Sequence, residues 1–273
     1  MKNFRRLWLD GPYLLWTAAF IVIPLFTIVY YGLTDKTGAF TWDNILAMGT
    51  PERMKALILS LVLSLIATAV CLVMAYPLAL ILTNLKSGAT GFIVSIFIIP
   101  MWMNSLLRIL AWQTLLERNG VINQILQAMH LPKLYIINTP YAIALGMIYD
   151  FLPFMILPIY NTIVKLDTTL NEAARDLGAN GSLAFLRVTF PLSAPGIVSG
   201  VSMVFLPAMT NYVVLDMLYN STYIMGSLIG SYFNAYNWHG GSMIALVLLG
   251  IICVFTLLSG GSDEDARTGG ALL

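Results

Sequence analysis

The segment Thr168–Pro191 reads TTLNEAARDLGANGSLAFLRVTFP, and the rest of the chain is organised around it. It is the longest part of the chain without an apolar run of membrane length, yet its residues are patterned for helices rather than for a slack loop. Thr169 precedes Glu172 by three residues, a capping box that predicts the start of a helix. Gly178 stands where such a helix closes through a left-handed residue. The segment therefore predicts a short helix that ends in a glycine elbow.

A second short helix is predicted after the elbow. Asn180 or Ser182 can cap it, and residues Leu183–Val188 can form it. Pro191 is expected to stop it, because proline lacks the N–H group that a helix interior needs. Two short helices joined by a glycine and held between membrane spans predict a surface on which another protein docks.

The composition excludes an ordinary soluble protein. Hydrophobic residues make up 59% of the chain and charged residues only 10%, whereas a soluble domain carries about 25% charged residues. The net charge of +1 excludes a strongly basic nucleic-acid binder. Cys71 and Cys253 lie inside apolar runs, and His130 and His239 lie in predicted loops far apart in sequence. We therefore interpret the cysteines as packing residues and expect no metal site.

The apolar runs predict an all-α membrane protein with six spans in a single transmembrane domain, residues 1–273. A helix needs about 20 apolar residues to cross roughly 30 Å of hydrocarbon, and six runs reach or approach that length. They lie at about 12–33, 56–83, 91–116, 141–164, 194–218 and 242–258. No small-residue cleavage site closes the first run, so we interpret it as an uncleaved span rather than a signal peptide.

Lysine and arginine predict the orientation of the spans, since cytoplasmic loops carry an excess of these residues. With both termini in the cytoplasm, the inner side holds eight: Lys2, Arg5, Arg6, Lys86, Lys165, Arg175, Arg187 and Arg267. The outer side holds five: Lys36, Arg53, Lys55, Arg118 and Lys133. This bias places the segment Thr168–Pro191 on the cytoplasmic side.

Two outer loops are expected to carry short helices. Residues 117–140 predict a turn at Asn119-Gly120, an amphipathic helix and a second turn near Pro132. Residues 219–241 are rich in aromatic side chains and lack lysine and arginine. That composition suits an interfacial helix or a surface that receives a partner protein.

Three charged residues lie within the predicted spans: Arg108, Asp150 and Asp216. An ionisable side chain in lipid costs at least a few kcal/mol, so each is expected to face the bundle interior, a partner or water. Asp150 lies between Tyr149 and Phe151, and a carboxylate beside aromatic rings attracts an ammonium group. Asp150 can line a path for a cationic substrate, or it can pair with Arg108 and stabilise the bundle. Both satisfy the desolvation requirement.

Six residues are predicted candidates for a substrate path. They are Asp150, Tyr149, Tyr160, Arg108, Asn211 and Asp216. For Asp216, near the outer end of its span, a solvated charge at a helix end is the alternative.

The segment Thr168–Pro191 also matches a family signature. Glu172-Ala173-Ala174, Gly178, Val188, Phe190 and Pro191 reproduce EAA-x3-G-x9-I-x-L-P, with valine for isoleucine and phenylalanine for leucine. The segment thereby resembles the EAA loop of type I ABC importer membrane subunits, which have six spans. In that family the loop is a coupling helix that fits a groove on the cytoplasmic ATPase. The resemblance implies that the ATPase-coupling residues are Glu172, Ala173, Ala174, Gly178 and Pro191.

A second resemblance narrows the family. Residues 104–123, NSLLRILAWQTLLERNGVIN, residues 152–160, LPFMILPIY, and the octapeptide EAARDLGA are similar to PotB-type permeases of spermidine/putrescine importers. The similarity covers the chain from about residue 10 to 240. Asn211 departs from it, since such permeases often carry an acidic residue near that position. The acidic run Asp263–Asp265 departs too. These differences bear on the substrate more than on the importer assignment.

The resemblance implies a transport subunit rather than an enzyme, located in a bacterial inner membrane. It would move polyamines from an external substrate-binding protein into the cytoplasm. The implied partners are a cytoplasmic ABC ATPase dimer that binds ATP and Mg, a second homologous permease and the lipid bilayer, with no nucleic acid. The chain has no GxxxxGK[ST] motif, so we expect no cofactor in it. The alternatives are a permease for an organophosphonate, a sugar or iron, and a secondary transporter.

Overall fold

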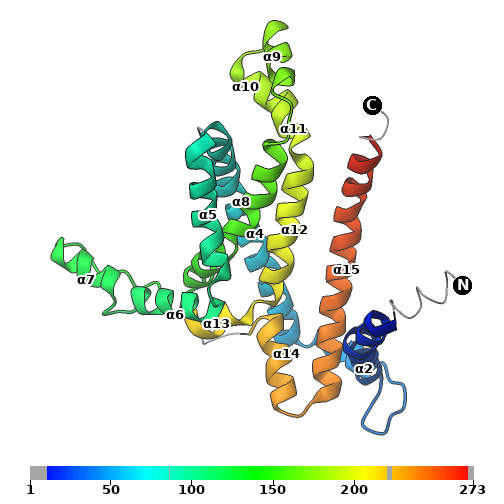
Figure 1. Cartoon of the computed structure of the whole chain (residues 1–273). Helices are drawn as coiled ribbons and strands as arrows, with labels where there is room; N and C mark the ends of the chain where they lie inside the picture. Colours follow the sequence, from blue (N-terminus) through cyan, green and yellow to red (C-terminus); the bar gives the residue numbers. More distant parts are fainter. Residues whose placement is uncertain (1–10, 86, 220–222, 270–273) are drawn as a thin grey trace, which may run out of the picture. The chain divides into compact units, whose positions relative to one another are not determined.

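The computed structural model describes residues 11–85, 87–219 and 223–269. Its regular elements in these ranges are helices, apart from one isolated bridge between Thr34 and Phe40 (Figure 1). The predicted all-α class is confirmed for the described residues. The chain forms two compact units, one from the described parts of 1–57 and 228–253, the other from those of 58–227 and 254–273.

Among the residues that the structure describes, four helices are long and apolar enough to cross a membrane, and two bent pairs raise the number to six if each pair counts as one span. The four cover Gly11–Leu33, Pro51–Asn84, Pro140–Ile163 and Trp238–Ser259. They correspond to the first, second, fourth and sixth predicted runs. The last belongs to α15 (Trp238–Gly269), which begins before residue 242 and continues past residue 258. The sequence estimate of 242–258 was therefore too short at both ends.

The third predicted run, 91–116, is not one straight helix. α5 (Ser87–Trp102) ends near Pro100, and α6 (Ser105–Leu116) begins after Asn104, with a bend of 99° between the two. Proline interrupts the backbone ladder of α5. The Asn104 side chain then accepts a hydrogen bond from the Leu106 amide (2.8 Å) and starts the new helix.

The fifth predicted run, 194–218, is also broken. α12 (Ala194–Thr210) stops at Asn211, whose ψ of 86° leaves the helical region, and α13 (Tyr212–Leu218) follows. Asn211 caps α13, because its side chain accepts a hydrogen bond from the Val214 amide (3.4 Å). A polar side chain therefore lies at the break itself.

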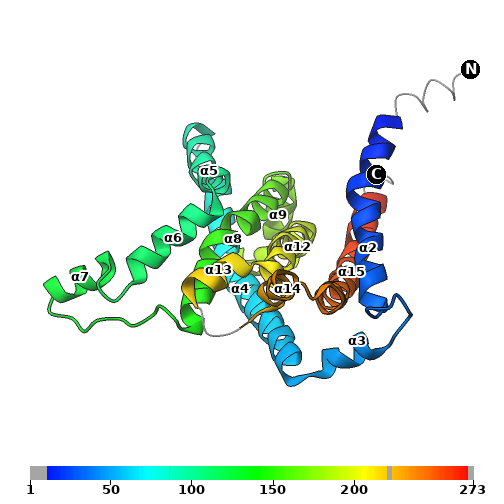
Figure 2. The same cartoon turned by 90° about the horizontal axis from the view of Figure 1, so that it is seen from below.

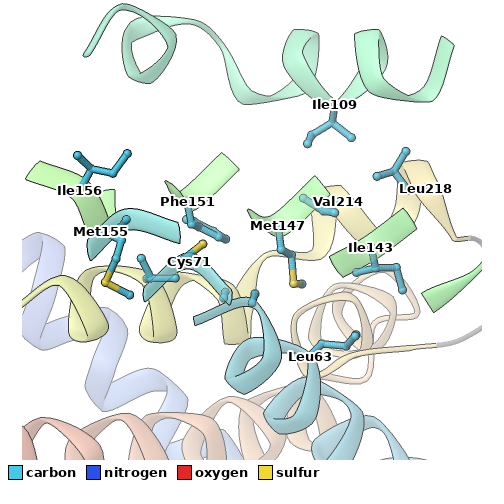
Figure 3. Packing of buried hydrophobic residues seen from close by; sticks show 14 of the residues in the cluster. Leu63, Cys71, Ile109, Ile143, Met147, Phe151, Met155, Ile156, Val214 and Leu218 are labelled. Atoms are coloured by element: carbon cyan, nitrogen blue, oxygen red, sulfur yellow. The ribbon is translucent and has the colours of Figure 1, made fainter. Parts of the chain in front are cut away.

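The larger unit has one apolar core. Its side chains come from α4 (Pro51–Asn84), α6, α8 (Pro140–Ile163), α12 and α13, as Figure 3 shows for part of the cluster. α8 and α12 approach so closely that small residues are required. A Cβ at Gly196 would lie 2.5 Å from Thr162 Oγ1, and one at Gly200 would lie 2.8 Å from Met155 Sδ. α8 and α12 therefore form a rigid pair.

The smaller unit contains π-helical η1 (Ala18–Val22), α2 (Ile23–Leu33), α3 (Asp43–Leu46) and the first part of α15. His239 Nδ1 lies 3.0 Å from the Tyr31 carbonyl oxygen, and Arg53 donates to Tyr232 Oη at 3.1 Å. The Arg53 guanidinium also lies 5.0 Å from the Tyr232 ring centre. These contacts join α2 to α15, and the start of α4 to α14 (Met225–Asn234), through aromatic side chains.

The two short helices predicted in residues 117–140 and 219–241 are present. α7 (Val121–Ala128) follows Gly120, and α14 (Met225–Asn234) lies within residues 219–241. The buried Asn123 side chain donates to the Leu134 carbonyl (2.9 Å) and accepts from the Leu134 amide (2.8 Å), closing the loop around α7. α7 lies away from α8, at the far end of α6 (Figure 2).

Candidate functional site

The first helix of the segment Thr168–Pro191 is α9 (Thr168–Asp176), and its cap differs from the predicted one. The Asp167 carboxylate accepts a hydrogen bond from the Thr169 amide at 2.9 Å. The capping box based on Thr169 was therefore wrong, because Thr169 is already helical. Hydrogen bonds from Thr169 hold the pKa of the exposed Asp167 carboxyl below its usual value.

The predicted glycine elbow is present. Gly178 has a φ of +91°, a left-handed conformation. The Gly178 amide donates to the Arg175 carbonyl (2.9 Å), and the Ala179 amide donates to the Ala174 carbonyl (3.0 Å). These are the two hydrogen bonds of a Schellman closure, so the end of α9 is fixed by backbone geometry.

The second helix begins as predicted but does not end as predicted. Asn180 caps α10 (Gly181–Ala184), its side chain accepting a hydrogen bond from the Leu183 amide (2.8 Å). The chain continues through the π-helical turn η3 (Phe185–Thr189) into α11 (Phe190–Leu192). Pro191 does not stop this helix, because it lies in the first turn of α11, where a missing N–H is tolerated.

The chain instead bends at Ser193. The axes of Gly181–Leu192 and Ala194–Thr210 differ by 60°. Ser193 is fully buried, and its hydroxyl lies 2.7 Å from the hydroxyl of Tyr76 on α4. The Tyr76 ring centre is 5.8 Å from those of both Phe185 and Phe190. Tyr76 thus fixes the base of the segment to α4.

Tyr76 and Ser193 were not predicted as functional residues. Tyr76 lies inside an apolar run, and the two residues are 117 positions apart. The only local signal was a hydroxyl group next to Pro77 within a membrane span. Asn171 was missed too, although its side chain accepts a hydrogen bond from Thr189 Oγ1 (3.1 Å) and joins α9 to η3.

α9 and α10 lie beyond the ends of α8 and α12, at one end of the larger unit (Figure 1). No residue of α9 is buried; Glu172 and Ala173 are exposed, and Ala174 is half-buried. Leu177 is 90% exposed. Beneath the helix lies a cavity of about 390 Å³, lined by the ends of α4 and α8 together with residues of α9, α10 and η3.

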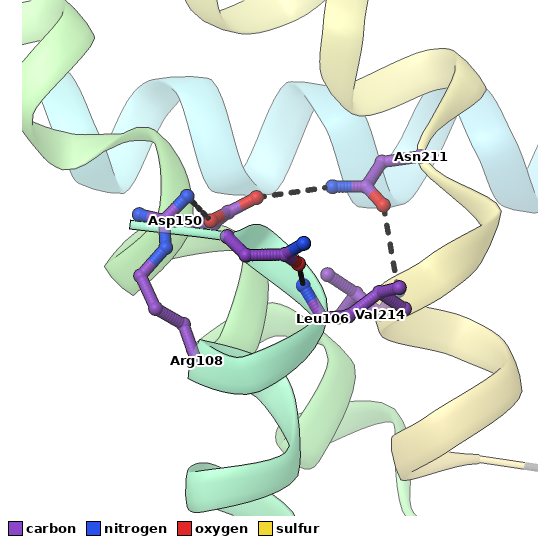
Figure 4. Close-up of polar contacts among 6 residues, drawn as sticks. Leu106, Arg108, Asp150, Asn211 and Val214 are labelled. Atoms are coloured by element: carbon purple, nitrogen blue, oxygen red, sulfur yellow. Dashed lines mark hydrogen bonds and ion pairs between the residues drawn. The ribbon is translucent and has the colours of Figure 1, made fainter. Parts of the chain in front are cut away.

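The structure brings three of the predicted path residues together (Figure 4). Arg108 Nη2 of α6 lies 2.6 Å from Asp150 Oδ1 of α8, and the two side chains are 6% and 7% exposed. Asn211 Nδ2 lies 3.3 Å from Asp150 Oδ2. The carboxylate therefore joins α6, α8 and the break between α12 and α13. Of the two alternatives for Asp150, pairing with Arg108 is the one this structure contains.

The other predicted path residues lie elsewhere. Tyr149 is exposed, and its ring centre is 5.3 Å from that of Trp112 on α6. Tyr160 is half-buried and lies roughly 15 Å from Asp150 along α8, at 1.5 Å per residue. Asp216 is exposed on α13 and faces a pocket of about 500 Å³. Asn104, Ser105, Leu106 and residues of α13 line the rest of that pocket.

Comparisons with known proteins agree with these features. Residues 75–261 match the family described as "Binding-protein-dependent transport system inner membrane component". The spermidine/putrescine transport system permease protein PotB of Salmonella typhimurium (strain SL1344) is 34% identical over 253 residues, covering 89% of this chain and 88% of that protein. PotB of Escherichia coli (strain K12) is 35% identical over 243 residues, covering 85% of this chain and 88% of that protein.

A solved structure shows the same fold. A chain in the crystal structure of a bacterial alginate ABC transporter, in complex with its alginate pentasaccharide-bound periplasmic protein, superposes with a TM-score of 0.81. The sequences are 17% identical, and the superposition covers 97% of both chains. The relatives are named as permease proteins, so this chain is a multi-pass inner-membrane transport component rather than an enzyme. The chain belongs to the family of binding-protein-dependent transport system inner membrane components, as a PotB-type ABC permease.

Proposed function

We propose that this chain is the membrane permease of an ATP-driven importer that carries spermidine and putrescine into the cytoplasm. Relatives named for spermidine/putrescine transport, 34% and 35% identical over most of both chains, support the substrate class. The structural observation that carries the mechanism is α9. It is an exposed helix with a capped start and a fixed end, and it lies between α8 and α12 in the chain order.

The residues Glu172, Ala173, Ala174, Gly178 and Pro191 form the coupling surface for a cytoplasmic ATPase. α9 leads from α8 and, through η3 and α11, into α12. Because α8 and α12 are packed without room for a Cβ at Gly196 or Gly200, a displacement of α9 moves both helices. Binding energy that differs between closed and open ATPases supplies the bias for this movement.

The six candidate residues line the substrate path, with Asp150 at its centre. Asp216 faces an open pocket and is exposed, so it is the first carboxylate that a cation would meet. Asp150 is buried and already paired, so contact with a substrate requires a rearrangement of α6 or α13. Tyr149 and Trp112, on the helices that carry Asp150 and Arg108, add a pair of aromatic rings that attract an ammonium group.

The complete transporter contains six spans of this chain in one transmembrane domain, with the EAA loop and both termini in the cytoplasm. A second homologous permease, two copies of an ATPase that bind ATP and Mg, and an external substrate-binding protein complete it. The complex of a bacterial alginate ABC transporter with a periplasmic protein, a chain of which shares this fold, supports an external binding protein as a partner.

Uptake of labelled spermidine and putrescine by cells lacking this chain tests the proposal. Returning the wild-type chain is expected to restore uptake, and returning Gly178→Val is not. If the wild-type chain assembles with an ATPase but restores uptake of neither polyamine, the transporter serves another solute, such as an organophosphonate, a sugar or iron.

A further inference from the structure

The Arg108–Asp150 ion pair lacks the hydrogen bonds of a fitted structural bridge. Arg108 Nη2 lies 2.6 Å from Asp150 Oδ1, yet Arg108 Nε and Nη1 have no hydrogen-bond partner among the residues that the structure describes. A buried pair offsets its desolvation cost only when the remaining donors are bonded as well. The guanidinium is therefore held by the charge of one carboxylate and not by a fork of hydrogen bonds.

The second oxygen of Asp150 is held by a neutral group that lies at a break between two helices. Asn211 Nδ2 lies 3.3 Å from Asp150 Oδ2, and Asn211 is the residue at which α12 ends and α13 begins. A change in the group that binds the Asp150 carboxylate therefore acts directly on the Asn211 side chain at this break (Figure 4).

Aromatic side chains lie on the helices that carry the pair. Trp112 on α6 and Tyr149 on α8 have ring centres 5.3 Å apart. Aromatic faces attract an ammonium group. Asn104, Ser105 and Leu106 at the start of α6, two to four residues before Arg108, line the open pocket that contains Asp216. An outer carboxylate and an inner one therefore share the helix that carries the arginine.

We propose that Arg108 is an internal counter-cation that occupies Asp150 until an ammonium group of the substrate replaces it. The inference rests on the proposed transport of polyamines. The exchange keeps the buried carboxylate neutralised in both states, so no unpaired charge is created at Asp150 inside the membrane. It also removes one polar link between α6 and α8, and α6 begins directly after the bend of 99° that separates it from α5.

A pair that only stabilises the bundle and a pair that is exchanged for the substrate predict different activities for the variants of Arg108 and Asp150. If the pair only stabilises the bundle, Arg108→Gln and Asp150→Asn each leave one buried charge, and the neutral double variant restores function. If Arg108 stands in for the substrate, the double variant still lacks the carboxylate and stays inactive. Arg108→Gln then frees Asp150 for the substrate, and Arg108→Lys keeps a competing ammonium group in place.

The experiment measures spermidine binding to the permease–ATPase complex in lipid nanodiscs by calorimetry, and spermidine transport in proteoliposomes. We expect Arg108→Gln to bind spermidine about tenfold more tightly than wild type and to transport it more slowly. Arg108→Lys is expected to bind as wild type does, and Asp150→Asn and the double variant to lose both binding and transport. Arg118→Gln, which removes an outer-loop arginine beside Tyr135, is the control for charge alone and should bind as wild type does.

Two results would overturn the inference while leaving the polyamine assignment intact. One is wild-type transport by the double variant, and the other is unchanged affinity in an assembled Arg108→Gln complex. If Arg108→Gln does not assemble, transport by the double variant alone distinguishes the two roles of the ion pair. Absence of spermidine binding and transport by the wild-type complex would overturn the proposed substrate, and this inference with it.

Discussion

Replacing Gly178 by valine removes the conformation that ends α9 and little else. The residue has a φ of +91°, and no atom lies within 4 Å of a Cβ built on it. Valine therefore meets no steric obstacle from the rest of the chain. Its cost is the left-handed conformation, about 1–2 kcal/mol for an L-residue and more for a β-branched one.

The expected magnitude follows from this conformation. The hydrogen bonds to the Arg175 and Ala174 carbonyls favour the closed elbow with either residue, so they do not enter the difference between the two chains. The left-handed conformation alone disfavours the closed elbow of Gly178→Val by about 2 kcal/mol, roughly a 30-fold change in the ratio of closed to open forms. α9 has no buried residue, so membrane insertion and the core are expected to be unaffected.

The assay measures ATP hydrolysis and spermidine uptake by the same reconstituted complex. Gly178→Val is expected to keep ATP hydrolysis but to reduce the number of spermidine molecules carried per ATP by tenfold or more. Gly181→Val is the matched control, because Gly181 is an exposed glycine of the same segment with no positive φ and nothing near its Cβ. A normal transport ratio in Gly178→Val would refute the coupling role of the elbow.

Three further predictions concern the support of the site. Tyr76→Phe removes the buried hydroxyl bond at the α11–α12 bend and is expected to cost about 1–3 kcal/mol, seen as a lower Tm of the complex and less transport per ATP; unchanged values of both would exclude the anchoring role. Because the pKa of Asp167 is lowered in the folded chain, its cap stabilises α9 at neutral pH and weakens as pH falls through that lowered pKa. The protection of α9 amides against hydrogen exchange, relative to the intrinsic rate at each pH, should therefore fall in acid for wild type, whereas Asp167→Ala should show low protection at both pH values. Gly200→Leu drives a side chain into Met155 and is expected to cost at least 1–3 kcal/mol and reduce assembly, whereas Gly250→Leu, with open space around it, should assemble normally.

The features that the sequence predicted correctly depend on neighbouring residues. Membrane-length runs report their own hydropathy, so the four long helices were found near their observed positions. Gly178 was found because a left-handed helix end selects glycine wherever it occurs. The cap of α9 was predicted at the wrong residue because two neighbouring residues can both act as a cap. Asp167 and Thr169 are two positions apart, and in the structure Asp167 caps the helix.

The features that the sequence did not predict depend on distant contacts or on how a helix is interrupted. The run 91–116 is apolar on both sides of the 99° bend. Hydropathy therefore does not distinguish a straight span from two helices joined at Asn104. The Tyr76–Ser193 contact joins residues 117 positions apart, for which no local pattern exists. Pairing of Arg108 with Asp150 was one of two alternatives, and only the fold brings the side chains together.

Accumulation of spermidine inside proteoliposomes tests the central claim most directly. The vesicles would contain this chain, its partner permease and the ATPase, with the binding protein outside and no ion gradient or membrane potential. The account predicts spermidine uptake that requires ATP hydrolysis and is lost in Gly178→Val. Uptake that proceeds without ATP when a membrane potential is imposed would contradict it, because the chain would then be a secondary transporter.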